Sequence, residues 1–523
     1  MSDTAMSDTA MSDTAMTIGT LAEGEGLIRA GDPPRIVAEH AVFLFYPFRH
    51  GTASWPLKPT ETLGSLAGQD WLPNIGGEPS DPKGQSLWKE SPWPLTDLDP
   101  QVTEQLTVRD GQGALKVLAL PSQRNIRKWL TGGQVSELRL RLPFSASARK
   151  RLERRGLPRI DSVGVDFGSI RLLPFRTGQG VLLVETRFVT GGPMPDTVLV
   201  EAATALCHDR GLEWRLTNGD HVPTRGGKDR FTLASLLGSL VQDTALQPLN
   251  GRRLFSYAFA AFDERLDDQR RDRLLVQLSR KYTDDYRIMD PLGDASHVRV
   301  FDTVAHAAYS EGCATVVERL PANGADKPPD FLTGFLKNAV EARYLGVAAL
   351  DVHAREALLT LSRDSTFWPD MDNPSEEQIE SLSRLQKQIL AYRLRCRVSR
   401  VSPISMHNSF HEILSNAFRL DGILRDVNDD AQEIGTYLQE RQAELKRESE
   451  KIWRLLIKMI AGASILSVVT DLLNFFGIKF YSGDAAIVLD FDSYLLYIVV
   501  LIFIFSFALF FAPLIFLRNS RDD

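Results

Sequence analysis

The sequence is poor in cysteine: Cys207, Cys313 and Cys396 are the three cysteines among 523 residues, and they are far apart. Three scattered cysteines form neither the disulfide framework of a small secreted domain nor a zinc site built from cysteine pairs. This usage fits a reducing compartment and excludes the disulfide-rich class of extracellular proteins.

Blocks of lysine and arginine are also absent, and the net charge is −7. Proteins that bind nucleic acids usually present a concentrated basic patch, so we expect no nucleic-acid partner. The serine-hydrolase pattern Gly-x-Ser-x-Gly and the metalloprotease pattern His-Glu-x-x-His do not occur either. We therefore expect no enzymatic activity.

Long apolar runs are missing before residue 450, and the chain begins with a polar five-residue repeat, MSDTAMSDTAMSDTAM. A signal peptide needs an apolar stretch, so residues 1–34 are expected to be a disordered tail rather than a signal. The last seventy residues are strongly apolar, in contrast to the rest of the chain.

Short apolar segments bounded by turn residues predict β-strands over much of residues 35–325. The predicted strands are 36–48, 115–120, 135–144, 160–175, 181–189, 253–262 and 298–317, and RTGQG at 176–180 predicts a hairpin turn. Helical spacing occurs at 231–241 and 268–282. Residues 35–325 are therefore expected to form a cytosolic mixed α/β domain.

Residues 326–403 predict long helices instead. One helical pattern runs from Phe331 to Ser362. A second begins after Ser375, a residue suited to cap a helix N-terminus. Pro403 interrupts this pattern, and a third helix is predicted to begin near Ile404.

The third pattern, a predicted stalk over 404–458, repeats apolar residues at steps of three and four. The repeating residues are Phe410, Leu414, Ala417, Leu420, Leu424, Val427, Ala431, Ile434 and Leu438, with Leu445 and Ile452 in the same frame. Such spacing is typical of a coiled coil. Because no proline or cap interrupts 404–477, we predict one helix on the order of 110 Å long that packs against copies of itself.

Two apolar runs predict transmembrane helices at 459–477 and 494–517, within a membrane region spanning 459–517. A buried core helix is the alternative for the first run. Basic residues precede the first run and follow the second, whereas Lys479 is the one basic residue of the loop between them. This asymmetry predicts a multi-pass protein of the cell membrane with both termini, including the tail 518–523, in the cytoplasm.

The first predicted span carries small and polar residues on one face. Ala463, Ser467, Thr470 and Asn474 follow one another at steps of four, three and four, and Asp471 borders them. Two interpretations are open: tight packing between helices through small residues, or a water-lined pore where several copies meet. The carboxylate favours the pore, because charged groups inside membranes usually face water or a bundle interior.

The order of these parts resembles the CorA-type magnesium transporter family, in which a cytosolic α/β domain, long helices, a stalk and two spans follow one another. The first span of that family ends in Gly-Met-Asn, or Gly-Ile-Asn in a zinc-transporting branch. The matching residues here are Gly477, Ile478 and Lys479. The resemblance implies a homopentamer with its pore lined by the first span, its mouth at these three residues, and Mg²⁺ as a transported or regulatory ion.

Lys479 replaces the asparagine of the family motif. Five lysines at a pore mouth repel Mg²⁺ and suit an anion-selective or tightly gated mouth. Snorkelling of the lysine, or screening by Asp484, Asp490 and Asp492 in the loop, would relieve that repulsion. The sequence thus leaves the sign of the transported ion open.

Two further clusters lie on the predicted stalk. The acidic residues are Asp421, Asp426, Asp429, Asp430 and Glu433, which predict either an exposed coiled-coil face or a divalent-cation sensor between subunits. His407 and His411 have the spacing of a metal-binding pair, but a solvated helix start is the expected role.

Two functions from different classes follow. The first is an oligomeric ion channel or transporter. The second is a membrane-anchored cytosolic sensor or effector, whose hairpin anchors the protein or permeabilises the membrane. The small and polar face distinguishes them, because an anchor tolerates leucine there and a pore does not.

Overall fold

The computed structural model describes the chain in segments. These are residues 33–50, 89–91, 93, 95–106, 117–120, 140–157, 160–175, 177, 179–208, 215–216, 233, 237, 246–248, 254–283, 296–320, 329–365, 374–475, 501 and 505. The chain divides into two compact units, one made of Met1–Trp368 and Lys387–Asn428, the other of Pro369–Gln386 and Asp429–Asp523.

Among the described residues, twelve strands of the first unit form one sheet. Its main path is β12 (His297–Phe301), β13 (Val304–Tyr309), β14 (Gly312–Glu318), β11 (Phe255–Phe262), β2 (Glu39–His50), β7 (Gln179–Val189), β6 (Ser162–Pro174), β4 (Val117–Leu120) and β3 (Lys89–Ser91). Off this path, β10 (Leu246–Pro248) pairs with β2, β5 (Leu140–Pro143) pairs with β6, and β9 (Arg215–Leu216) pairs with β5. A separate short pair joins β1 (Ile36–Val37) to β8 (Met194–Pro195).

The sheet is mixed, because β11 and β14 run parallel while its other described pairs are antiparallel. The predicted strands are confirmed, and β6 and β7 pair as the two arms of the predicted hairpin. All eight residues of β11 are buried, which explains why its sequence is apolar on both faces, apart from Ser256, rather than alternating.

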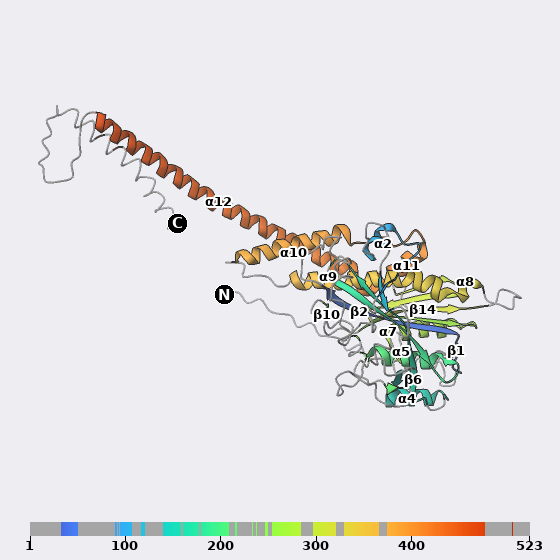
Figure 1. Ribbon diagram of the computed structural model, residues 1–523. Helices are drawn as coiled ribbons and strands as arrows, with labels where there is room; N and C mark the ends of the chain where they lie inside the picture. The colour runs from blue at the N-terminus through green and yellow to red at the C-terminus, as the bar shows by residue number, and fades with distance from the viewer. Residues whose placement is uncertain are drawn as a thin grey trace, which may run out of the picture. The chain divides into compact units, whose positions relative to one another are not determined.

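One face of the sheet is covered by α4 (Ala146–Arg154), α5 (Asp196–His208) and α7 (Asp268–Arg280) (Figure 1). Leu274, Leu275 and Leu278 of α7 join Ala258 and Ala260 of β11 in this core. The Asp267 side chain caps α7 by accepting a hydrogen bond from the backbone N–H of Arg270. The helix predicted at 268–282 is therefore confirmed.

The opposite face is covered by η1 (Leu336–Tyr344), α9 (Leu345–Ser365) and α11 (Ser405–Phe418), with α8 (Asp330–Thr333) and α2 (Pro100–Leu106) nearby (Figure 1). Aromatic rings fill this side. The Phe410 ring lies 5.7 Å from Tyr257, 5.2 Å from His306 and 4.9 Å from Tyr344, measured between centroids. This aromatic cluster packs α11 against the sheet.

The helical pattern predicted over 331–362 is observed as three successive helices. Gly334 ends α8, the nine residues Leu336–Tyr344 after Phe335 form the π-helix η1, and α9 continues to Ser365. The helical prediction is confirmed, while a single regular α-helix is not what the chain forms. Spacing of apolar residues does not distinguish a π-turn from an α-turn.

The helix α10 (Glu376–Arg395) begins where Ser375 was predicted to cap it. The Ser375 hydroxyl accepts a hydrogen bond from the Gln378 N–H at 3.2 Å, and the Gln378 side chain accepts one from the Ser375 N–H at 2.8 Å. This reciprocal capping box satisfies two backbone donors at the helix start and confirms the prediction.

The helix predicted without interruption from Ile404 is broken at Arg419. Arg419 has a left-handed backbone with φ of 55°, and its N–H donates to the Asn416 and Ser415 carbonyls. The next helix, α12 (Leu420–Phe475), has 56 residues and is about 84 Å long. The break follows from packing, because Phe418 lies 5.0 Å from Phe255 of the sheet and holds the end of α11 there.

The heptad seam changes its environment along the chain. Phe410, Val427 and Ile434 are fully buried, whereas Leu445 and Ile452 are 49% and 65% exposed. The seam as far as Leu438 is therefore covered without a second copy of the chain. The predicted self-association depends on the residues that follow.

Candidate functional sites

The C-terminal part of α12 is apolar and exposed. By length and composition, one helix among the described residues could cross a membrane, the Leu420–Asp471 part of α12, and none of its apolar window is buried. The interpretation of the first apolar run as a buried core helix of the chain is therefore wrong. Exposed side chains of this region include Leu455, Ile457, Met459, Ile460, Ile465, Leu466 and Val468.

The second predicted span, 494–517, and the loop before it lie almost wholly outside the described residues. Leu501 and Phe505 are described, and both are helical and exposed. The predicted mouth residues Gly477, Ile478 and Lys479 also lie outside the described part of the chain.

The predicted polar stripe lies within α12. Ala463, Ser467 and Thr470 are exposed, and Asn474 belongs to the same helix. The Thr470 hydroxyl donates to the Leu466 carbonyl at 2.8 Å, so it is satisfied within its own helix. Asp471 differs from it, because no hydrogen bond or ion pair reaches its carboxylate within the described part of the chain.

The exposed end of the heptad seam and the polar stripe share one face of α12. Leu445, Ile452 and Leu456 lead to Ala463 at steps of seven, four and seven, and the stripe continues from there at steps of four and three. The sequence analysis predicted one helix through both the seam and the stripe, but it did not include Leu456, which joins them.

The predicted acidic cluster does not form a metal site within one chain. Asp421, Asp426, Asp429 and Glu433 are exposed, and Asp430 is partly buried. Among the described residues, no group of three histidine, cysteine, aspartate or glutamate side chains is arranged to hold a metal ion. The exposed-face interpretation fits this arrangement, and a cation sensor between subunits stays a prediction.

The two histidines of α11 have separate partners. His407 is buried, with its Nδ1 2.9 Å from the Ser402 hydroxyl, whereas His411 faces Asp351 of α9. The expected solvated helix start is therefore wrong, and so is a metal site shared by the pair. The physical reason is Phe410, whose burial between the two histidines holds this turn against the sheet.

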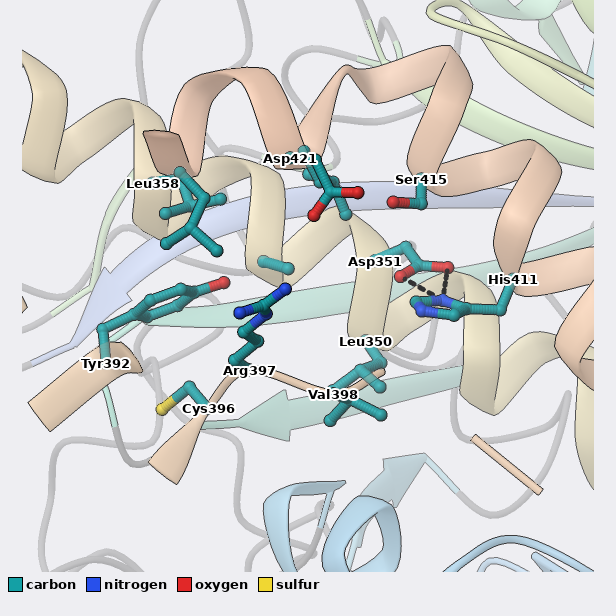
Figure 2. A pocket seen from close by; sticks show the side chains of 13 residues that line it. Leu350, Asp351, Leu358, Tyr392, Cys396, Arg397, Val398, His411, Ser415 and Asp421 are labelled. Carbon is teal, nitrogen blue, oxygen red and sulfur yellow. Dashed lines mark hydrogen bonds and ion pairs between the residues drawn. The ribbon is translucent and has the colours of Figure 1, made fainter. Parts of the chain in front are cut away.

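A pocket in the first unit surrounds His411 (Figure 2). Its polar lining consists of Asp351, Tyr392, Cys396, Arg397, His411, Ser415 and Asp421. The His411 Nδ1 lies 2.8 Å from Oδ1 and 3.0 Å from Oδ2 of Asp351, whose side chain is 1% exposed. The Nδ1–H of the ring therefore donates to the Asp351 carboxylate.

Electrostatics support a proton held in this pair. Burial works against the charged ring, but Asp351, the Val398 carbonyl and Asp421 together raise the pKa of His411. Burial raises the pKa of Asp351, and His411 limits that rise. The sequence analysis missed Asp351; a carboxylate inside the apolar run of α9 was the available signal.

No protein-family model, curated protein or solved structure matches this chain. The structure has a mixed α/β sheet domain and a long C-terminal helix with an apolar, exposed end. A function for these parts must therefore be inferred from their residues and geometry.

Proposed function

We propose that the chain is a homo-oligomeric membrane ion channel or transporter of the CorA type, most simply a pentamer. In this proposal, two spans cross the cell membrane with both termini in the cytoplasm, and the first span lines the pore. The observation that carries the proposal is the single face of α12 on which the exposed seam, Leu445 to Leu456, continues into the stripe of Ala463, Ser467 and Thr470.

Copies of this helix that associate through their exposed seam would turn the polar stripe toward a common axis. The other faces, which carry Ile, Leu and Val, would then meet lipid or the second span. A carboxylate at the centre of a lipid-facing helix costs about 2.5–3.5 kcal/mol on insertion scales, and less nearer the outer end of the span, where Asp471 lies. Water in a pore would hydrate Asp471 instead, which agrees with its lack of a partner among the described residues.

Charge gives the proposed pore its selectivity. A ring of Asp471 carboxylates attracts cations, whereas Lys479, eight residues further along the sequence, would resist them at the mouth. Mg²⁺ is the divalent cation that the family resemblance suggests as the transported or regulatory ion.

A second candidate, the membrane-anchored sensor or effector, is favoured by a specific observation. The Ser464 and Thr470 hydroxyls donate to carbonyls of α12 at 2.9 and 2.8 Å, so neither hydroxyl requires a water-filled path. In this alternative, the hairpin only anchors or permeabilises the membrane and the α/β domain acts in the cytosol.

Two neighbouring leucine variants separate these functions. Ser467 lies on the polar stripe and Val468 lies off it, so Ser467→Leu should block a pore while Val468→Leu leaves it open. The measurements are Mg²⁺ and chloride flux into liposomes, together with the oligomer mass in mild detergent. A monomeric mass, or equal flux in both variants, contradicts the channel and favours the anchored sensor.

A further inference from the structure

A basic stripe runs along α12 just before its apolar end. Arg447, Lys451, Arg454 and Lys458 follow one another at steps of four, three and four, so they occupy one side of the helix. All four are exposed. We call them the basic stripe. Leu445 and Ile452 lie on the far side of the same turns, so the helix presents an apolar and a basic side at this level.

The charges of the basic stripe are largely uncompensated. Arg454 forms an ion pair with Glu450 at 3.8 Å, but both side chains are more than half exposed, and such pairs contribute little. No ion pair holds Arg447, Lys451 or Lys458 within the described part of the chain. Between residues 445 and 458 the helix carries five basic and two acidic residues, which leaves an excess of positive charge.

The basic stripe leads into the lipid-facing side of the proposed span. Seven residues after Lys458 on the same side stands Ile465, followed by Val469, and both belong to the apolar end of α12. Trp453 is 62% exposed within the same turns, and tryptophan is enriched where membrane meets water. The positive charges therefore lie on the side and at the level where lipid headgroups would be.

We propose that the basic stripe binds anionic phospholipid headgroups of the cytoplasmic leaflet. This inference rests on the membrane placement of the proposed function and adds a lipid partner to it. Charge complementarity supplies the attraction, because basic residues next to a span are drawn to the negative surface of that leaflet. The seam on the far side of the helix stays free for association between copies.

The contribution of each basic residue to lipid binding should decrease with its distance from the membrane surface. Relative to Met459, where the predicted span begins, Lys458 and Arg454 lie within about 8 Å along the helix, and Arg447 lies about 18 Å away. The surface potential falls off within a Debye length of about 8 Å at physiological salt. Lys458 and Arg454 should therefore dominate, with an effect of about fivefold each on the local preference for anionic lipid.

Quenching of Trp453 fluorescence by brominated lipids reports which lipid surrounds this part of the helix. The full chain is reconstituted into vesicles of phosphatidylglycerol and phosphatidylcholine in which one or the other lipid is brominated. The Trp453→Phe variant gives the background from the other tryptophans. We expect brominated phosphatidylglycerol to quench Trp453 more strongly at equal mole fraction, and Lys458→Gln with Arg454→Gln to remove most of that difference.

Lys446→Gln is the matched control, because it removes one exposed positive charge that lies off the basic stripe and far from the span. Equal quenching by the two brominated lipids in the wild type overturns the proposal while leaving the membrane placement intact. Binding of soluble heparin that is independent of vesicle charge also overturns it and assigns the basic stripe to a soluble polyanion. Absence of quenching by either lipid contradicts the membrane placement itself.

Discussion

Between Leu420 and Leu438 the apolar seam of α12 is buried, whereas from Met459 to Asp471 the helix is apolar and exposed. One continuous helix thus carries two kinds of apolar surface. The first is covered within a single chain, and the second is exposed in the part of the chain that the structure describes. Hydrophobic spacing alone does not distinguish them, because it records which side chains avoid water and not what covers them.

The largest expected effect tests the exposed end. Asp471→Leu removes the one carboxylate of the apolar stretch and should abolish ion flux, because a ring of leucine side chains dries a narrow pore. Asp471→Asn keeps the size and loses the charge, so cation flux should fall without a change in oligomer mass. Flux into liposomes measures both, and undiminished flux in the leucine variant places Asp471 outside the conducting path.

Two alanine variants test whether buried and exposed seam residues differ in their contribution to the free energy of unfolding. Phe410→Ala empties a fully buried position in the aromatic cluster and should lower the free energy of unfolding by about 3–5 kcal/mol. Leu445→Ala removes an exposed side chain, and its effect on the same quantity should stay within about 0.5 kcal/mol.

The control for these two alanine variants is a measurement of self-association. Chemical denaturation gives the stability of the domain, and native mass in mild detergent gives the oligomer. Leu445→Ala combined with Ile452→Ala should weaken the oligomer and spare the domain. If both seam regions affect stability alike, the exposed residues are covered within one chain after all.

The third prediction concerns pH and the buried pair of His411 with Asp351. The pKa of His411 is raised above its ordinary value of 6.5, so its pair with Asp351 stabilises the fold below that pH and loses this contribution as the pH rises through the raised value. One such group gives a slope of at most about 1.4 kcal/mol per pH unit. His411→Gln combined with Asp351→Asn, which leaves no unpaired buried carboxyl, should remove this loss on the alkaline side, measured by denaturation between pH 6 and 9.

The acid side of the same profile has another origin. Burial lowers the pKa of His40 and His407 to about 4 and that of His306 to about 3. These rings are neutral in the fold and charged in the unfolded chain below about 6.5, so stability falls as the pH drops below that value. The variant that carries both His411→Gln and Asp351→Asn should keep this loss of stability at acid pH. A flat alkaline limb in the wild type would contradict the pairing of His411 with Asp351.

The smallest expected effect concerns the predicted mouth. Lys479→Asn removes the repelling charge and restores the Gly-x-Asn pattern of the CorA family, so Mg²⁺ flux should rise a few-fold. Chloride flux measured in the same vesicles is the control. A rise in both fluxes indicates a general opening of the pore rather than relief of cation repulsion.

Sequence patterns predicted the strands of the sheet and the helix cap at Ser375, because each depends on residues close together in the chain. They did not predict the break at Arg419, which depends on Phe418 meeting Phe255 across a long separation. They also missed the pairing of His411 with Asp351, since nothing in either local segment indicates that α9 and α11 lie side by side. The polar stripe was identified because it needs only helical spacing.

The π-helix η1 has a consequence for changes in chain length. Phe335 and Tyr344 are nine residues apart, which in an α-helix is about two and a half turns and would place them on opposite sides. Through η1 both are buried, and their stacked rings lie 6.2 Å apart. A one-residue deletion inside η1 that restored α-helical turns would rotate Tyr344 away from Phe410, so this segment should accept substitutions more readily than deletions.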